Sequence, residues 1–226
     1  YECSLWVKVL MLLLGASALE NSALKWSADH RRHHRNVDTP KDPYNIKWGG
    51  WWAHILWILF KTQEEKENLS NVRDLQKDPI VMLQHKYYLG IAIFLDAVLP
   101  MAITWLLWSN PLMGLIASFI ATVLAWHATF FVNSLAHMNH WFATRPYSRA
   151  NSSVDSPIVA FLTFGEGYHN YHHIRQWDYR NGVRWYQYDP TKWLIFGLSL
   201  IGATWNLNRE SDEEIAALRL ANLETT

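Results

Sequence analysis

The sequence predicts an all-α integral membrane protein in which a transmembrane helix hairpin carries a cytoplasmic, histidine-rich helical cap. Three observations lead to this fold class. Two apolar stretches are each long enough to span a bilayer. Fourteen tryptophans and ten tyrosines are typical of the aromatic belts found at lipid headgroups. Six of the eleven histidines fall into two short clusters with the same spacing. We expect one domain over residues 1–226.

The two apolar stretches cover residues 87–108 and 112–132, and each exceeds the roughly 18 residues that a membrane span requires. Only Ser109, Asn110 and Pro111 separate them, so we expect a tight hairpin. The segments outside the hairpin carry the basic residues and are therefore predicted to be cytoplasmic, on the same side of the membrane. These basic residues include Arg31, Arg32, Arg35, Lys61, Lys86, Arg145, Arg149 and Arg175.

Other segments are apolar but too short to cross a bilayer. They could lie flat on the cytoplasmic leaflet or form buried core helices of a cytoplasmic domain, and the sequence leaves both possibilities open. They cover residues 5–19, 51–60 and 191–205. Residues 61–79 are charged and predict a solvated loop and helix. Ser211 and Glu214 have the spacing of a capping box that begins a polar helix.

Composition excludes several classes of function and site. Twenty basic and twenty acidic residues leave no net charge to attract a nucleic acid. The single cysteine, Cys3, excludes an internal disulfide and a thiolate metal cluster, so a metal must be bound by nitrogen and oxygen. The chain starts at Tyr1 without an initiator methionine or a signal sequence, and we expect a fragment or a processed form.

Two histidine boxes, "HRRHH" and "HNYHH", repeat the spacing i, i+3, i+4, which places three imidazoles on one face of a helix. Neutral imidazole is a common ligand of transition metals. In "NSLAH", Thr129, Asn133 and His137 are spaced i, i+4, i+8, a stripe of about 12 Å along the second span. The candidate metal ligands are His30, His33, His34, Asn133, His137, His169, His172 and His173.

These candidates are too many for one four-coordinate ion and somewhat few for two iron-type centres. The alternative reading is that the histidines contact anionic lipid headgroups. Asp29 and Glu166 adjoin the boxes and could fix the imidazole tautomers, or could be ordinary surface charges. Outside the boxes we expect His54 and His85 at the membrane interface, His140 in an exposed loop, His127 as a packed polar residue, and Asp96 in a hydrogen bond between helices.

Six stretches together resemble the membrane-bound fatty acid desaturases, in particular the stearoyl-CoA (Δ9 acyl-CoA) branch: "ENSALKWSADHRRHH", "DTPKDPYN", "NSLAH", "RPYS", "GEGYHNYHH" and "DYRNG". The resemblance implies a non-haem di-iron centre, with O₂ as co-substrate, held by nine histidines in three boxes and one further site, assisted by an asparagine. The first box, HxxxxH, is absent. The resemblance therefore implies that this box and an N-terminal hairpin precede residue 1, and that residues 1–226 alone are inactive.

Carried over by position, the resemblance assigns the eight candidate ligands above to the iron centre. It places Trp26 and Thr129 at the bend of an acyl tunnel, and Asn21, Arg32 and Lys61 near the CoA group. The alternatives are an interface anchor for Trp26 and solvated or lipid-facing charges for Arg32 and Lys61. The segment "MNHWFAT" after His137 is about three residues longer than the family pattern, so we expect a different loop there.

The implied reaction is O₂-dependent insertion of a cis double bond into a saturated acyl chain, with acyl-CoA or another acyl carrier as substrate. No flavin or haem motif is visible, so an electron donor such as cytochrome b5 or a ferredoxin is implied. The implied membrane is the endoplasmic reticulum in a eukaryote or the inner membrane in a bacterium. The competing functions are a membrane di-iron lipid hydroxylase, a histidine-rich metal transporter and a non-catalytic relic. Acyl chain length and double-bond position stay open.

Overall fold

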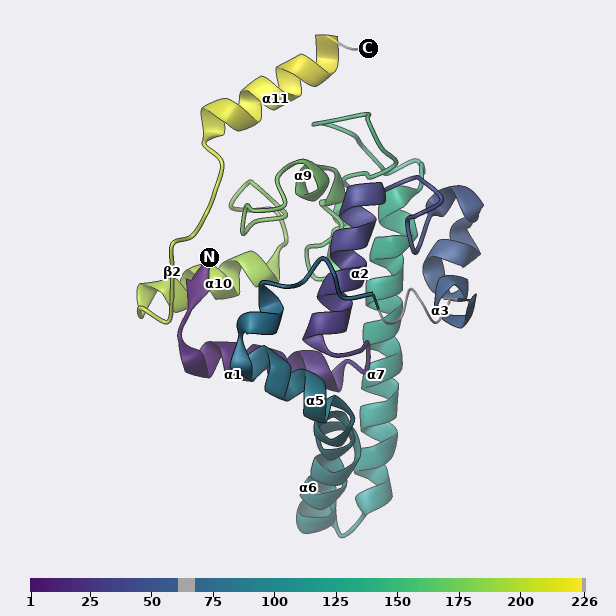
Figure 1. The fold of residues 1–226 in the computed structure, drawn as a ribbon, viewed down its shortest axis with the longest axis vertical. Coiled ribbons are helices and arrows are strands. Elements are labelled where there is room, and N and C mark those ends of the chain that lie inside the picture. The colour runs from purple at the N-terminus through teal and green to yellow at the C-terminus, as the bar shows by residue number, and fades with distance from the viewer. Residues whose placement is uncertain (61–67, 225–226) are drawn as a thin grey trace. The chain divides into compact units, whose positions relative to one another are not determined.

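The computed structural model describes residues 1–60 and 68–224 and is mostly helical, as the sequence predicts (Figure 1). The α-helices are α1 (Leu5–Ser17), α2 (Ala23–Asn36), α3 (Trp57–Phe60), α5 (Pro79–Ile93), α6 (Leu99–Trp108), α7 (Pro111–Asn133), α8 (Pro157–Leu162), α9 (His169–Ile174), α10 (Pro190–Leu200) and α11 (Asp212–Glu224). Shorter turns are η1 (Ile46–Trp48), η3 (Leu75–Lys77) and η5 (Leu135–His137), of the 3-10 type, and η2 (Trp52–Leu56) and η4 (Phe94–Val98), of the π type.

The chain forms two compact units. Unit 1 comprises residues 1–4, 33–60 and 128–226, and unit 2 comprises residues 5–32 and 61–127. The boundaries fall inside α2 and α7. The expectation of a single domain over 1–226 stays a prediction.

Unit 2 contains most of the predicted hairpin. Its first helical run extends from Pro79 to Trp108, eight residues longer at its start than the apolar stretch. The reason is a strong start signal: the Asp78 carboxylate accepts hydrogen bonds from the backbone N–H groups of Ile80 and Val81, and Pro79 occupies the first turn. Ser109 ends the run in the left-handed conformation (φ 53°), and α7 begins two residues later.

The two arms of the hairpin pack closely near the turn. A Cβ added at Gly114 of α7 would collide with the backbone of Pro100 in α6. The Gly114 N–H donates to Thr104 Oγ1 at 3.1 Å. Elsewhere the apolar side chains are open: only 11 % and 17 % of the most apolar windows of the two runs are buried within the protein. Both runs are long and apolar enough to cross a membrane.

The rest of unit 2 is arranged around α5. Helix α1 packs against α5 (Figure 1). An ion pair of 2.6 Å joins Lys8 to Asp78. The start of α2 is held by the side chain of Gln84, which accepts from Ala23 N–H at 3.2 Å. A core cluster of Leu24 and Ala28 from α2, Val81 from α5, and Val72 packs together in this unit. Helix α2, which carries the first histidines, is thereby fixed at its beginning.

Unit 1 contains the small exceptions to the all-α fold. Strands β1 (Glu2–Cys3) and β2 (Thr204–Trp205) pair antiparallel, with Glu2 opposite Trp205. The predicted capping box is present, because Ser211 Oγ accepts from Glu214 N–H and the Glu214 carboxylate accepts from Ser211 N–H, both at 3.2 Å. The core cluster is Tyr147, Tyr171, Val183 and Ile215.

The short apolar segments form helices that bury one side and expose the other. In α1, Val7 and Ala16 are buried, while Leu5 and Leu14 are more than half exposed. Segment 51–60 becomes η2 and α3, and segment 191–205 becomes α10 followed by β2, which the sequence analysis did not foresee. Residues 61–67 of the charged stretch lie outside the described residues.

Candidate metal centre

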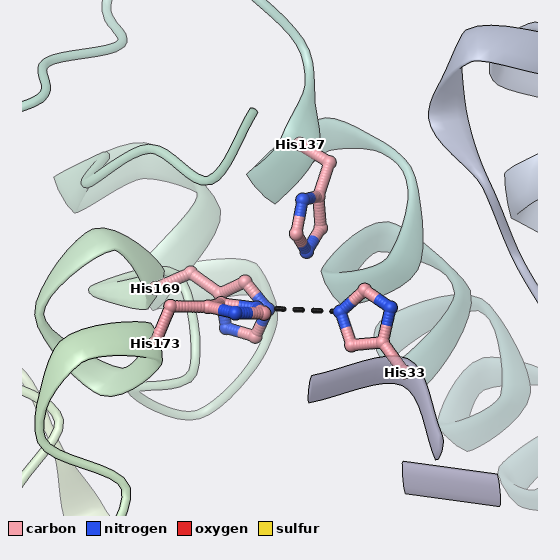
Figure 2. A group of neighbouring side chains, drawn as sticks. All are labelled: His33, His137, His169 and His173. Atoms are coloured by element: carbon pink, nitrogen blue, oxygen red, sulfur yellow. Dashed lines mark hydrogen bonds between the residues drawn. The ribbon is translucent and has the colours of Figure 1, made fainter. Parts of the chain in front are cut away.

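Four buried imidazoles from three separate segments of unit 1 converge on one point (Figure 2). His33 comes from the end of α2, His137 from η5, and His169 and His173 from α9. They offer one nitrogen each within 4.8 Å of one another, and none is more than 8 % exposed. Two of the segments are more than a hundred residues apart in sequence, so only folding brings these rings together.

The nitrogens that face one another are Nε2 atoms. His33 Nε2 lies 3.3 Å from His173 Nε2, and His173 Nε2 lies 3.1 Å from His169 Nε2. The ring of His137 stands edge-on to those of His33 and His169, with centroids 4.9 and 4.8 Å away. In the same unit, His34 Nε2 lies 3.0 Å from His172 Nε2. Both boxes therefore contribute rings to close imidazole pairs.

The box "HNYHH", residues 169–173, is the third histidine box of the family pattern. Contacts on its N-terminal side hold it in place. Gly165 adopts the left-handed conformation (φ 106°). Gly167 lies so close to α8 that an added Cβ would collide with the backbone at Ala160. One carboxylate oxygen of Asp155 accepts from the N–H groups of Asn170 and Tyr171 at 2.8 and 3.3 Å. These contacts fix a helix of only six residues, which places His169 and His173 on the same side.

His137 does not continue the α-helical stripe that the sequence predicts. Helix α7 ends at Asn133, Ser134 precedes the next turn as its N-cap residue, and His137 lies on that 3-10 turn, η5. Thr129, Asn133 and His137 consequently do not form one straight row. Asn133 is buried, whereas Thr129 is half-buried on α7.

Electrostatics favours neutral rings in this cluster. Burial, reinforced by neighbouring imidazoles, keeps the pKa of His169 and of His173 well below the usual value for histidine. Burial, with His33 nearby, lowers the pKa of His172 to about 4. The rings therefore present lone pairs, as metal ligation requires.

The donor set fits a transition metal. His137 Nε2 is buried and has no hydrogen-bond partner among the described residues, although it points into the cluster (Figure 2). An unpartnered buried nitrogen costs about 1–3 kcal/mol, and a cation at the centre would remove that cost. Imidazole donors suit iron, zinc, copper and nickel. We conclude that the four rings can hold a metal ion.

Other predicted site residues lie in unit 2. His30 and Trp26 stack on successive turns of α2, with ring centroids 4.6 Å apart. The Asp29 carboxylate accepts from Arg32 at 3.3 Å. Asn21 has φ 82° and donates its N–H to Tyr88 Oη at 3.1 Å. Lys61 lies outside the described residues.

Glu166 is exposed, as an ordinary surface charge would be, and a role for it beside the imidazoles stays a prediction. Expectations about four other polar residues are wrong. His54 is buried and bonded to Ser134 Oγ at 3.0 Å, rather than interfacial. His140 is half-buried and bonded to the Leu135 carbonyl, and His127 is exposed. Within residues 1–60 and 68–224, no hydrogen bond joins Asp96 to another helix, and its Oδ2 is buried without a partner.

Asp42 was not among the predicted site residues, yet it contacts His33 on the side of the ring away from His173. Its Oδ1 lies 2.8 Å from His33 Nδ1, and its side chain is 1 % exposed. A carboxylate in this position orients the ring and fixes its tautomer. The stretch "DTPKDPYN" contains Asp42 and was part of the resemblance, but only the chain reversal after α2 brings it to His33.

The sequence was also compared with known protein families and with curated proteins. The sequence profile of the family described as fatty acid desaturase matches residues 4–200. The chain belongs to the fatty acid desaturase family. It is 46 % identical over 202 residues to a probable acyl-CoA desaturase of Schizosaccharomyces pombe, covering 89 % of this chain and 42 % of that protein.

Two further relatives of this desaturase-family chain carry related names. Identity is 37 % to acyl-CoA desaturase 1 of Saccharomyces cerevisiae, over 92 % of this chain and 41 % of that protein. It is 31 % to human stearoyl-CoA desaturase 5, over 96 % of this chain and 66 % of that protein. The chain thus spans about two fifths of the length of the two yeast relatives. Family membership and the buried histidines together indicate a metal site.

Proposed function

We propose that the protein containing this chain is an acyl-CoA desaturase, which inserts a cis double bond into a saturated acyl chain. The observation that carries the proposal is the buried cluster of four imidazoles in a chain of the fatty acid desaturase family. The names of the relatives support acyl-CoA as the substrate. The balance is one O₂, two electrons and two protons taken up, two hydrogens removed from the acyl chain, and two waters formed.

The proposed cofactor is a pair of non-haem iron ions. With dioxygen they would supply the oxidising power needed to remove hydrogen from an unactivated methylene, which no side chain has. Geometry supports His33, His137, His169 and His173 as ligands, together with the pair His34 and His172. The sequence spacing and the resemblance support His30 and Asn133.

We propose that the protein positions the metal ligands and the substrate and excludes bulk water from the reacting carbons. The cluster is buried, so its rings are pre-arranged and bulk water is kept from the reacting carbons. Trp26 and Thr129 are proposed to line the acyl tunnel, and Asn21, Arg32 and Lys61 to contact the CoA group. We also propose a cytoplasmic location for the histidine boxes, and electron delivery by a cytochrome b5 or ferredoxin type of protein.

The complete gene, expressed in a desaturase-deficient yeast, tests the proposal. Lipids extracted from the cells are converted to methyl esters and analysed by mass spectrometry. We expect monounsaturated chains from the unsubstituted protein and background levels from His173→Gln, because that change removes one metal-facing nitrogen. His127→Gln is the matched control: His127 is exposed on α7, and its replacement is expected to leave the product unchanged.

Three outcomes would contradict the proposal. Hydroxylated products without unsaturation would assign the protein to the hydroxylases. Unsaturation that survives His173→Gln would remove the cluster from the reaction. Absence of any product, with iron bound to the purified full-length protein, would leave a metal centre and dismiss the desaturase activity.

A further inference from the structure

Two carboxylates of the loop after α2 support clustered histidines, one by direct contact and the other through a serine. Asp42 lies against His33 Nδ1 at 2.8 Å. Asp38 accepts from both donors of Ser152: the hydroxyl at 2.6 Å and the backbone N–H at 2.7 Å. Ser152 Oγ in turn lies 2.8 Å from His137 Nδ1. All of these residues belong to unit 1.

The two carboxylates are also connected to each other. The N–H of Asp38 donates to Asp42 Oδ2 at 3.2 Å. Asp38 has φ 64°, a left-handed conformation that is uncommon outside glycine, asparagine and aspartate. That conformation and the bond to Asp42 make residues 38–42 one compact turn. A change in one carboxylate is therefore transmitted to the support of both rings.

The hydrogen-bond directions fix the tautomer of His137. A serine hydroxyl has one proton, and the Ser152 hydroxyl donates it to Asp38 Oδ1. Its oxygen then accepts from His137, which places the ring proton on Nδ1 and leaves a lone pair on Nε2. Nε2 is the buried atom that lacks a hydrogen-bond partner within the described residues. By the same reasoning Asp42 holds the proton of His33 on Nδ1, with a lone pair on Nε2.

We propose that residues 38–42 form a shared tautomer clamp, in which Asp38 acts through Ser152 on His137 while Asp42 acts on His33. Asp38, Ser152 and Asp42 are positioning residues that present two Nε2 lone pairs to the metal. The proposal rests on the metal centre of the proposed function. It differs from a purely structural staple, because the direction of each hydrogen bond matters as well as its presence.

Asp38→Asn tests whether the direction of the hydrogen bond to Ser152 matters, because the variant keeps the bond and reverses it. The amide is the same size as the carboxylate, and its oxygen can still accept from Ser152 N–H. Its NH₂ group, however, donates to Ser152 Oγ, so the hydroxyl proton turns towards His137 Nδ1. The ring is then driven to the tautomer with its proton on Nε2, which cannot ligate through that atom. Outer-shell changes of this kind cost about 10- to 100-fold in metal affinity, and we expect that loss.

The experiment titrates Co(II), a coloured probe of the ligand set, into metal-free full-length protein in detergent, in competition with a chelator. Melting of the metal-free protein is measured in parallel. Asp38→Asn is expected to weaken binding with little change in melting. Adding Ser152→Ala to Asp38→Asn is expected to restore part of the affinity, because the misdirected hydroxyl is gone. Asp212→Asn, an exposed carboxylate on α11, is the matched control.

The outcomes separate the two proposals. Unchanged affinity in Asp38→Asn, with tight binding by the unsubstituted protein, would overturn the clamp alone. A double variant weaker than both single variants would assign Asp38 a structural role and also overturn it. No binding by the unsubstituted protein would remove the metal centre and the clamp together. If Asp38→Asn does not fold, the pair Ser152→Thr and Ser152→Ala decides: retained affinity in the first and loss in the second supports the clamp, and equal affinity overturns it.

Discussion

Buried polar side chains, more than helix propensity, hold the third histidine box in place. The amide of Asn170 accepts from Tyr147 N–H at 2.9 Å and donates to the Ser148 carbonyl at 2.8 Å. Asp155 caps the same helix through two N–H groups and is almost fully buried. A six-residue helix is unstable by itself. The hydrogen bonds of these buried groups offset the free energy of burying them and fix the orientation of the helix.

Burial of Asp155 predicts a pH dependence of stability. Burial raises the pKa of this carboxyl to about 7, against about 3.9 in an unfolded chain. Between these values the folded state binds the proton and the unfolded state does not. The contribution of Asp155 to stability is therefore complete below pH of about 4 and is lost as the pH rises to about 7, by up to about 1.4 kcal/mol per pH unit.

Asp155→Asn tests this, because the amide can accept the same two hydrogen bonds and does not titrate. Melting temperatures of the metal-free protein and of the variant are compared from pH 5 to pH 8. The variant is expected to gain on the unsubstituted protein as the pH rises. A difference that stays constant over this range would mean that Asp155 does not titrate there.

Some residues of the site could be predicted from the sequence, and others could not. The i, i+3, i+4 spacing predicted that each box presents rings on one face, and His33, His169 and His173 do converge. The candidate supporting acids, Asp29 and Glu166, were chosen because they adjoin the boxes in sequence. Glu166 lies in the turn before α9, so the helical spacing of the box does not fix its direction. The acid that supports His33 is Asp42, nine residues away, which only a folded loop brings near.

At the scale of elements, the position of α9 depends on close contact with α8. Gly167 N-terminal to α9 has no room for a side chain, because a Cβ would collide with the backbone of Ala160. Since α9 carries three of the six box histidines, a shift of this helix moves His169 and His173 together. The pattern "GEGYHNYHH" thus combines a packing requirement with the ligands that it positions.

Gly167→Ala is expected to destabilise the protein by about 1–3 kcal/mol, because the backbone of α8 must yield. Metal content per protein, measured by elemental analysis, is expected to fall as well. Gly197→Ala is the matched control: Gly197 lies inside α10 with nothing within 4 Å of an added Cβ, and alanine is expected to gain about 0.5–1 kcal/mol there. Equal melting of the two variants would contradict the packing argument.

Elements defined by local signals were predictable, and those defined by distant contacts were not. The loop from Ser109 to Pro111 and the capping box of Ser211 and Glu214 were both predicted, because each spans only a few residues. The pairing of β1 with β2 joins residues about two hundred positions apart and leaves no local periodicity. The end of α7 before His137 was equally hidden, because the sequence there continues to suit a helix.

At the scale of the whole molecule, the two long apolar runs predict a membrane topology. Their exposed apolar side chains include Leu106 at 79 % and Phe119 at 67 %, which are costly in water and favourable in lipid. Two spans joined by a short turn return the chain to its starting side. The segments before residue 79 and after residue 137 should therefore share one face of the membrane.

Cysteine labelling tests this topology, because Cys3 is the one cysteine of residues 1–226 and Cys3→Ser removes it. Ser109→Cys marks the turn of the hairpin, while Lys41→Cys and Arg149→Cys mark exposed sites before and after it. A membrane-impermeant maleimide is added to sealed vesicles of either orientation. We expect Lys41→Cys and Arg149→Cys to react from one face and Ser109→Cys only from the other. Reaction of all three from the same face would mean that the two helices do not span, since a thiol behind about 30 Å of hydrocarbon is protected from a charged reagent.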